Sequence, residues 1–355
     1  MEAYINSISA ISPQFTFTSE KLLQEVKEYD EVRNIKCIEP QYNEFIDPMA
    51  SRRMSRIIKM GVCSALKCLK DAGVTNPDAI ITGTGLGCIE DTEKFLMSIY
   101  ENEEKLLNPT PFIQSTHNTV GASIALILKC NNYNNTYVHR GFSFENALID
   151  SMMFLKENPS KNVLVGGVDE LTTNSFIITD RLGMWKKEPV NNLKLLDYKS
   201  NGSLAGEGAA FFVLSDRKNE KSFAKINSAD IFYKIENIPD AGKELSDRIQ
   251  KIAGDISKID LVLTGMNGDI NYDENYYYLR RTIFSNIPCT FYKHLCGEYD
   301  TASSFALYLA SGILKEQSVP AVLRLDNKPL KDIKNILIYN HLRNVNHSVI
   351  ILSSC

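Results

Sequence analysis

The segment from Tyr137 to Leu155, YVHRGFSFENALIDSMMFL, has the pattern of a short strand, a glycine turn and a helix. Many α/β enzymes place a nucleophile at such a turn, because the start of the helix stabilises an anion. Here Gly141 and Phe142 occupy the turn, and neither side chain can attack a substrate. The spacing of GFSFE also differs from the G-x-S-x-G elbow of hydrolases. The sequence therefore predicts the turn without the covalent chemistry.

Other residues that could take part in catalysis lie far apart from one another in the sequence. His117 lies in the polar segment STHNT, His139 precedes the glycine turn, and His294 follows Lys293. No partner can be assigned to any of these histidines from the sequence, so we interpret them as structural or surface residues. The loop GTGLG at 83–87 lacks the spacing of both phosphate-binding fingerprints, and we expect a tight turn there.

A loop rich in glycine, LLDYKSNGSLAGEGAAFFVL at 195–214, leads into an apolar strand. Nothing nucleophilic stands beside Glu207 in this loop. We interpret it as a structural loop in which the Glu207 carboxylate accepts hydrogen bonds from backbone donors. The residues that punctuate it are Asp197, Gly202, Gly206, Glu207 and Gly208.

Composition narrows the class of protein. The chain has 355 residues, a formal net charge of -4 and 44% hydrophobic residues, which suits two domains or one duplicated unit and argues against binding nucleic acid. The eight cysteines form no cluster with zinc spacing, so we expect reduced core residues, no metal and no cofactor. Neither a secretory signal nor a membrane span is apparent, and we expect a cytoplasmic protein.

The elements that must position these residues alternate between strands and helices, which favours a largely parallel sheet covered on both faces. The charged, Lys-rich stretch after residue 216 suggests a boundary between an N-terminal half, 1–216, and a C-terminal half, 217–355. Strands are predicted at 2–11, 136–141, 161–171, 206–216, 258–265, 335–342 and 348–354, and a strand followed by a turn at 78–87 and 289–297. Helices are predicted at 50–73, 90–100, 143–157, 274–284 and 300–315, and a Pro-marked loop followed by a helix at 108–128.

Taken in order, several segments resemble the β-ketoacyl synthase family of the thiolase-like fold. They are RRMSRIIKMGVCSALKCLKDAG, GTGLGCIEDTEKF, NPTPFIQSTHNTVGASIAL, GGVDELT and the Asp…Gly-Glu-Gly loop at 195–214. The resemblance implies an α/β, five-layer αβαβα sandwich made of two pseudo-symmetric halves. It also implies an obligate dimer.

In that family a cysteine at the start of a buried helix is acylated, and two histidines assist decarboxylation of a malonyl thioester. The resemblance places the nucleophile at Phe142, the first histidine near Gly265 and the second at Glu298. Lys293 keeps the family's offset from the second histidine, and Asp273 keeps the anchor of the first motif. A phenyl ring has no lone pair, so the resemblance implies a degenerate site that is inactive alone.

This pattern is most similar to a chain-length factor, as found in aryl-polyene or flexirubin-type biosynthesis. Such a subunit is not catalytic; it pairs with an active β-ketoacyl-ACP synthase as a heterodimer and shapes the acyl or polyene tunnel. The implied partners are that synthase and an acyl carrier protein. Phe112, Phe142 and Phe144 are the candidates for the tunnel wall or the interface.

Two alternatives stay open at this point. The chain could be a divergent β-ketoacyl-ACP synthase or acyltransferase that uses another thiol, such as Cys296 or Cys88. It could also be a homodimeric scaffold that binds an acyl carrier protein without elongating a chain.

Overall fold

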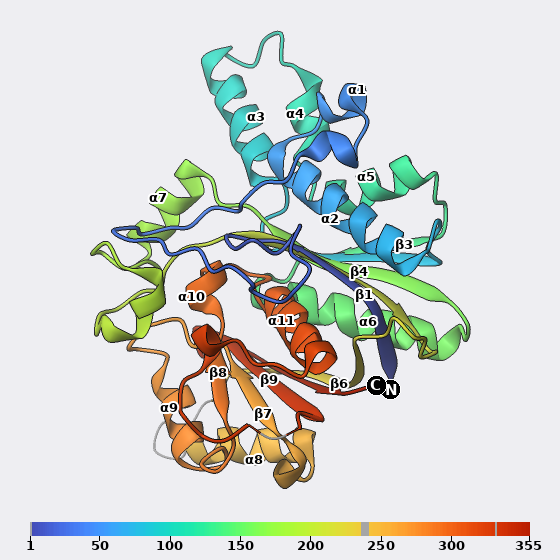
Figure 1. The fold of residues 1–355 in the computed structure, drawn as a ribbon. Helices are drawn as coiled ribbons and strands as arrows, with labels where there is room; N and C mark the ends of the chain where they lie inside the picture. Colours follow the sequence, from blue (N-terminus) through green and yellow to red (C-terminus); the bar gives the residue numbers. More distant parts are fainter. Residues whose placement is uncertain (1, 236–240, 331) are drawn as a thin grey trace.

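The computed structural model describes residues 2–235, 241–330 and 332–355 (Figure 1). Within these ranges ten strands form one mixed sheet in the order β3-β2-β4-β5-β1-β6-β10-β9-β7-β8. The strands are β1 (Ala3–Ile11), β2 (Ala79–Gly83), β3 (Tyr133–Tyr137), β4 (Asn162–Asp169), β5 (Gly208–Ser215), β6 (Ala224–Tyr233), β7 (Leu261–Thr264), β8 (Cys289–Phe291), β9 (Asn335–Leu342) and β10 (Asn346–Ser353).

The sheet contains the same topology twice. The order β3-β2-β4-β5-β1 recurs as β8-β7-β9-β10-β6, and the directions of pairing match strand by strand. The two sets meet where β1 and β6 pair antiparallel over Ala3–Ile5 and Ala224–Ile226. The described sheet is therefore built from two pseudo-symmetric parts.

Helices on and between these two parts produce five layers (Figure 1). Helices α6 and α11 lie between the two parts of the sheet, α2 and α5 cover the outer face of the first part, and α8 and α9 cover the outer face of the second. The helices are α1 (Pro48–Ser51), α2 (Arg56–Ala72), α3 (Ile89–Glu101), α4 (Pro109–Gln114), α5 (Thr119–Leu128), α6 (Ser143–Glu157), α7 (Thr173–Arg181), α8 (Ala241–Ala253), α9 (Glu274–Arg281), α10 (Lys293–Cys296) and α11 (Ser303–Glu316).

Side-chain alternation explains the apolar runs in the strands. Val163 and Val165 of β4 point into the central layer, whereas Leu164 points into the outer core under α2. Both faces of β4 are thus buried, and a strand of this kind reads as a continuous apolar run. Helix α11 is buried along nearly its whole length, as expected for a central helix with apolar residues on every side.

Three expectations about the elements need correction. The sheet is mixed rather than largely parallel, because β5 and β10 run antiparallel to both of their neighbours. The helix predicted at 50–73 is interrupted between α1 and α2, and the Asp47 carboxylate caps α1 by accepting the backbone N–H groups of Met49 and Ala50. The strand predicted at 136–141 is β3, which starts and ends earlier.

The cysteines were interpreted as reduced core residues, and this is confirmed for most of them. All eight are free, seven are buried, and Cys355 is exposed. No helix of the described residues is both long enough and apolar enough to cross a membrane.

Candidate functional site at the start of helix α6

Phe142 lies where the glycine turn enters α6. Residues Arg140–Phe142 form a single 3-10 turn, and the α-helix continues from Ser143. The phenyl ring is only 4% exposed and stacks on His139, with ring centroids 5.4 Å apart. Arg140 adopts a positive φ of 50°, which is uncommon for a residue other than glycine. The structure therefore places a buried ring at the head of a buried helix.

The turn itself depends on Gly141. A Cβ atom on Gly141 would lie 2.8 Å from the Cβ of Leu342, the last residue of β9. No side chain fits at that separation, so glycine permits the close approach. The start of α6 is thereby held against the β9–β10 turn.

Glu298, where the resemblance placed the second histidine, is 4% exposed. The ammonium of Lys293 lies 2.6 Å from Glu298 Oε2, and the Asn267 amide donates to the same oxygen at 2.7 Å. Lys293 has no exposed surface. A buried charge pair of this kind is fixed by its mutual attraction and its hydrogen bonds, so neither group is free to shuttle protons.

Asp273 organises the loop that brings Asn267 to Glu298. Its carboxylate accepts the backbone N–H groups of Asn267 at 3.1 Å and Gly268 at 2.8 Å. Burial raises the pKa of Asp273 to about 6, although these two hydrogen bonds oppose the shift. The retained aspartate thus acts as a loop anchor in this chain.

Gly265, near which the resemblance placed the first histidine, has no room for a side chain. A Cβ atom on Gly265 would lie 2.2 Å from Asn340 Oδ1 and 2.8 Å from the hydroxyl of Tyr276. The polar group that reaches Glu298 from this loop is Asn267, which the sequence analysis did not single out. The signal that could have found it is an amide in a loop directly after a buried strand, six residues before the retained Asp273.

A cavity of about 60 Å³ opens beside these groups, lined by Glu298, Leu342 and the apolar side chains of Leu171, Met184 and Trp185. Ligand pockets usually measure roughly 300–1,000 Å³, so this cavity is small. Its wall contains four acidic residues and one arginine: Asp169, Glu170, Glu298, Asp300 and Arg140.

The carboxylates of this cavity give it an acidic character. Arg140 pairs with Asp300 at 3.2 Å across the wall. Burial, followed by the nearby charge of Asp169, raises the pKa of Asp300 to about 6. The volume of about 60 Å³ leaves little room for a malonyl group.

The other candidate nucleophiles are poorly placed for chemistry. Cys88 and Cys296 have no exposed surface, and burial raises the pKa of both thiols, well above its usual range for Cys296. A raised pKa disfavours the thiolate, which is the reactive form. His294 is also fully buried and stacks on Phe291 with centroids 3.9 Å apart; burial lowers its pKa to about 3.

The three candidate phenylalanines lie in different environments. Phe112 is 57% exposed on α4, where it contacts Phe95. Phe144 has no exposed surface and packs on Phe212 in the central core, with centroids 5.9 Å apart. Residues two apart in a helix point in nearly opposite directions, so Phe142 and Phe144 diverge. The structure thus places Phe144 in the central core. His117 and His139 are exposed.

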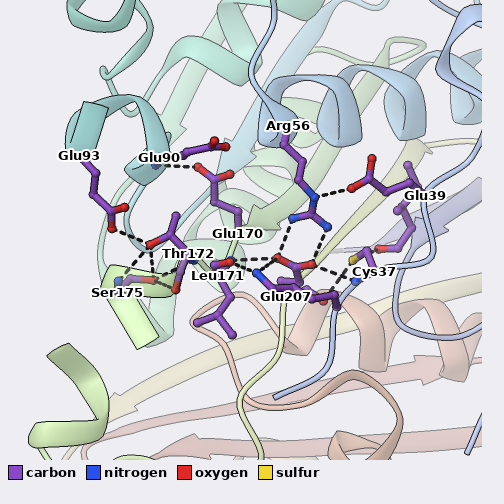
Figure 2. Close-up of polar contacts among 12 residues, drawn as sticks. Cys37, Glu39, Arg56, Glu90, Glu93, Glu170, Leu171, Thr172, Ser175 and Glu207 are labelled. Carbon is purple, nitrogen blue, oxygen red and sulfur yellow. Dashed lines mark hydrogen bonds and ion pairs between the residues drawn. The ribbon is translucent and has the colours of Figure 1, made fainter. Parts of the chain in front are cut away.

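The structural role predicted for Glu207, to accept hydrogen bonds from backbone donors, is confirmed (Figure 2). Its carboxylate accepts the backbone N–H groups of Cys37 at 2.9 Å and Leu171 at 3.0 Å, and it binds the Arg56 guanidinium through both oxygens. Burial alone would raise the pKa of Glu207, but the hydrogen bonds and charge of Arg56 outweigh it and lower that pKa. The loop therefore ties α2 to the ends of β4 and β5.

Solved structures share this fold over nearly their whole length. The structure described as the ishigamide ketosynthase/chain length factor is 17% identical, covers 100% of this chain and 99% of its own, and gives a TM-score of 0.79. A ketosynthase (ApeO) in complex with its chain length factor (ApeC) from Xenorhabdus doucetiae is 14% identical, with coverages of 99% and 98% and a TM-score of 0.75.

A third structure, described as a type II PKS acyl-carrier protein in complex with its ketosynthase (AntDE:AntF), is 14% identical, with coverages of 100% and 99% and a TM-score of 0.74. At these sequence identities the structural similarity establishes the fold only. Whether the site can catalyse a reaction has to be judged from its own residues. No curated protein matches the chain significantly.

The sequence also matches a family model directly. Residues 29–179 match the model described as the N-terminal domain of β-ketoacyl synthase. This range includes α2, the GTGLG turn, β4 and the start of α6, which carry the resemblance noted above. Residues 29–179 therefore belong to the β-ketoacyl synthase N-terminal domain family, and the described chain as a whole has the fold of the ketosynthases.

Proposed function

We propose that this chain is a non-catalytic subunit, similar to a chain-length factor, that pairs with an active β-ketoacyl-ACP synthase. In this proposal it shapes the tunnel in which an acyl or polyene chain grows and takes no part in bond formation. The observation that carries the proposal is the buried phenyl ring of Phe142 at the head of α6. A ring at that position offers no atom for thioester formation.

The surroundings of Phe142 support the same proposal. Glu298 is held by Lys293 and Asn267, and the neighbouring cavity is both small and acidic. A condensing enzyme would need a thiolate, an electron-withdrawing pair of histidines and room for an anionic malonyl group. The groups present are suited instead to keeping the loops in place.

An exposed apolar surface supports the pairing with a partner subunit. Strand β3 is an edge of the described sheet, so one side of its backbone is available for another strand (Figure 1). Exposed apolar residues lie on β3, just after it and on the neighbouring helices: Tyr133, Val138, Leu126 of α5 and Met153 of α6. Exposed apolar groups gathered at an open edge are typical of a protein interface.

The solved structures in the comparison add weight to the choice of partner. Two of them are described by a ketosynthase and a chain length factor, and a third contains an acyl carrier protein. We propose corresponding partners here, with the growing chain delivered by an acyl carrier protein. Phe112, Phe142 and Phe144 are the proposed tunnel or interface residues, and an aryl-polyene type of product is the proposed product class.

Co-expression tests the proposal most directly. A ketosynthase that carries a cysteine nucleophile and two histidines, encoded beside this chain, is co-expressed with it and the mixture is separated by size-exclusion chromatography. A stable 1:1 complex is expected, and intact mass spectrometry after incubation with an acyl thioester should show the acyl group on the partner alone. An acylated peptide from this chain, containing Cys296 or Cys88, would instead support the alternative of a divergent condensing enzyme or acyltransferase.

A further inference from the structure

A second and larger cavity lies between α3 and the segment that joins β4 to α7 (Figure 2). Its volume is about 790 Å³, within the usual range for small-molecule and side-chain pockets. Helix α3 presents one face to it, through residues spaced three or four apart that include Glu90, Glu93 and Met97. The proposed pairing and tunnel make no use of this cavity.

Glu170 lies in the wall of this cavity with a partly unsatisfied carboxylate. The side chain is 8% exposed, and one of its oxygens accepts the backbone N–H of Glu90 at 3.0 Å. The other oxygen has no hydrogen-bond partner among the described residues. A carboxylate buried with one neutral donor lacks a counter-charge, which is costly unless a ligand supplies one.

The cations around the cavity already have partners. Arg56 binds Glu207 through two hydrogen bonds of 2.7 and 2.6 Å and also pairs with Glu39. Lys94 lies 2.7 Å from Glu90 on the exposed side of α3. Neither Arg56 nor Lys94 is therefore left as a counter-charge for Glu170.

Lys36 also has partners already, and Glu93 is bound only by neutral donors. Lys36 donates to the carbonyl of Leu171 and lies 3.4 Å from Glu207. Glu93 accepts only from neutral groups, the hydroxyl of Thr172 at 2.6 Å and the amide of Asn174 at 3.3 Å. The carboxylates of Glu170 and Glu93 thus both face the cavity without a cation.

The pKa of Glu170 agrees with this geometry. Burial raises it to about 8; the Glu90 N–H opposes the rise, the charges of Glu90 and Asp91 add to it, and Arg56 reduces it in part. A raised pKa of a carboxyl group in a cleft indicates that nearby positive charge does not offset the cost of burying its ionised form. Such a group is a candidate for binding a cationic ligand. Helix capping explains the contact with Glu90 but not the second, unpaired oxygen.

We propose that this cavity binds an alkylammonium group, with Glu170 as its counter-charge and Glu93 as a second acceptor. The ammonium could belong to a free diamine or to a lysine side chain of another protein, since the two present the same chemistry. A metal ion fits less well, because the described residues contain no group of three or more His, Cys, Asp or Glu side chains arranged to hold one.

Isothermal titration calorimetry of the full chain with 1,5-diaminopentane tests this proposal, with 1,5-pentanediol as the uncharged probe of equal length. We expect the diamine to bind at least about tenfold more tightly than the diol. The variant Glu170→Gln keeps an oxygen for the Glu90 N–H and removes the charge, so it should lose about tenfold in diamine affinity. The control Glu157→Gln removes an exposed charge at the end of α6 and should bind as the parent does.

Two further measurements identify the source of the ammonium group and test whether it binds at Glu170. The peptide acetyl-Gly-Lys-Gly-amide is compared with its norleucine analogue. If the lysine peptide binds and the diamine does not, the natural ligand is a lysine side chain of another protein. If the diamine binds and the lysine peptide does not, the natural ligand is a free amine. At about pH 7, where Glu170 is largely protonated, diamine binding should release protons in the parent and not in Glu170→Gln, as shown by titrations in buffers of different ionisation enthalpy. Equal affinity of Glu170→Gln and the parent, or no binding of either ammonium probe at about 10 mM, would overturn the proposal.

Discussion

The ammonium of Lys293 and the carboxylate of Glu298 form an ion pair of 2.6 Å inside the protein, five residues apart in the sequence. Gly297, with a φ of 74°, reverses the chain between α10 and Glu298 and makes the contact possible. The pair lies where the resemblance placed a lysine and a second histidine. In this structure the two residues hold each other and the loop of Asn267 in place.

This relationship predicts a large stability loss for Lys293→Met. The substitution leaves Glu298 buried without its counter-charge, and breaking a buried pair in this way costs about 3–5 kcal/mol. Urea unfolding followed by circular dichroism gives the change in the free energy of unfolding. The double variant Lys293→Met/Glu298→Gln should recover a large share of the loss, because Gln still accepts the Asn267 amide and carries no charge. A double variant as unstable as the single one would contradict the pairing argument.

Phe142→Ala should separate the structural from the tunnel role of the ring. Removing a buried phenyl group costs about 3–5 kcal/mol, measured as the drop in the free energy of unfolding. Phe142→Leu keeps most of the apolar volume and should cost less. In a reconstituted complex with an active ketosynthase, the proposed function predicts longer products from Phe142→Ala, since the space is enlarged. An unchanged product distribution, with the complex intact, would argue against Phe142 as a wall residue.

His294 predicts a pH dependence of stability with a defined sign. Its pKa is about 3 in the fold, because of burial, and about 6.5 when unfolded, so the unfolded chain binds a proton that the folded chain does not. The stability contribution is therefore fully present above pH ~6.5 and is lost as the pH falls toward ~3, by up to about 1.4 kcal/mol per pH unit.

The variant His294→Leu tests this contribution, because it removes the titration and keeps an apolar side chain against Phe291. The unfolding free energy of the parent minus that of the variant, measured between about pH 4 and 7, should decrease as the pH falls. Asp273 and Asp300, whose raised pKa values act in the opposite direction, are common to both proteins and cancel in the difference. Parallel curves for the two proteins would show that His294 does not titrate as described.

The sequence predicted elements whose pattern is local. Helix α6 was expected at 143–157 and lies there, and β9 was expected at 335–342, because apolar periodicity fixes both without distant partners. Strand β6 was missed, since its residues are mostly half-buried and no clear alternation marks them. A break at residues 52–55, between α1 and α2, likewise interrupts a helix that periodicity alone made continuous.

The sequence supports a site prediction only where the identity of one residue decides the chemistry. Phe142 cannot form a thioester because its side chain is a phenyl ring. Glu207 was interpreted as structural because no nucleophile stands beside it in its loop. In contrast, the contact between Asn267 and Glu298 joins residues from two loops, and Glu170 meets α3 across a cavity built from four separate segments. Such contacts depend on the packing of the whole fold, which no local pattern in the sequence records.

The open edge at β3 predicts how the partner subunit attaches. Leu126 of α5 is 80% exposed, so Leu126→Glu should leave the isolated chain as stable as the parent, within about 0.5 kcal/mol. In the proposed heterodimer the same change buries a charge in an apolar interface and should weaken pairing by at least about tenfold, as measured by surface plasmon resonance. The matched control is Ile270→Glu, which alters a 48% exposed residue in the loop before α9 and should pair normally. Equal loss of pairing in both variants would point to a general effect of charge, and no loss in Leu126→Glu would move the interface away from β3.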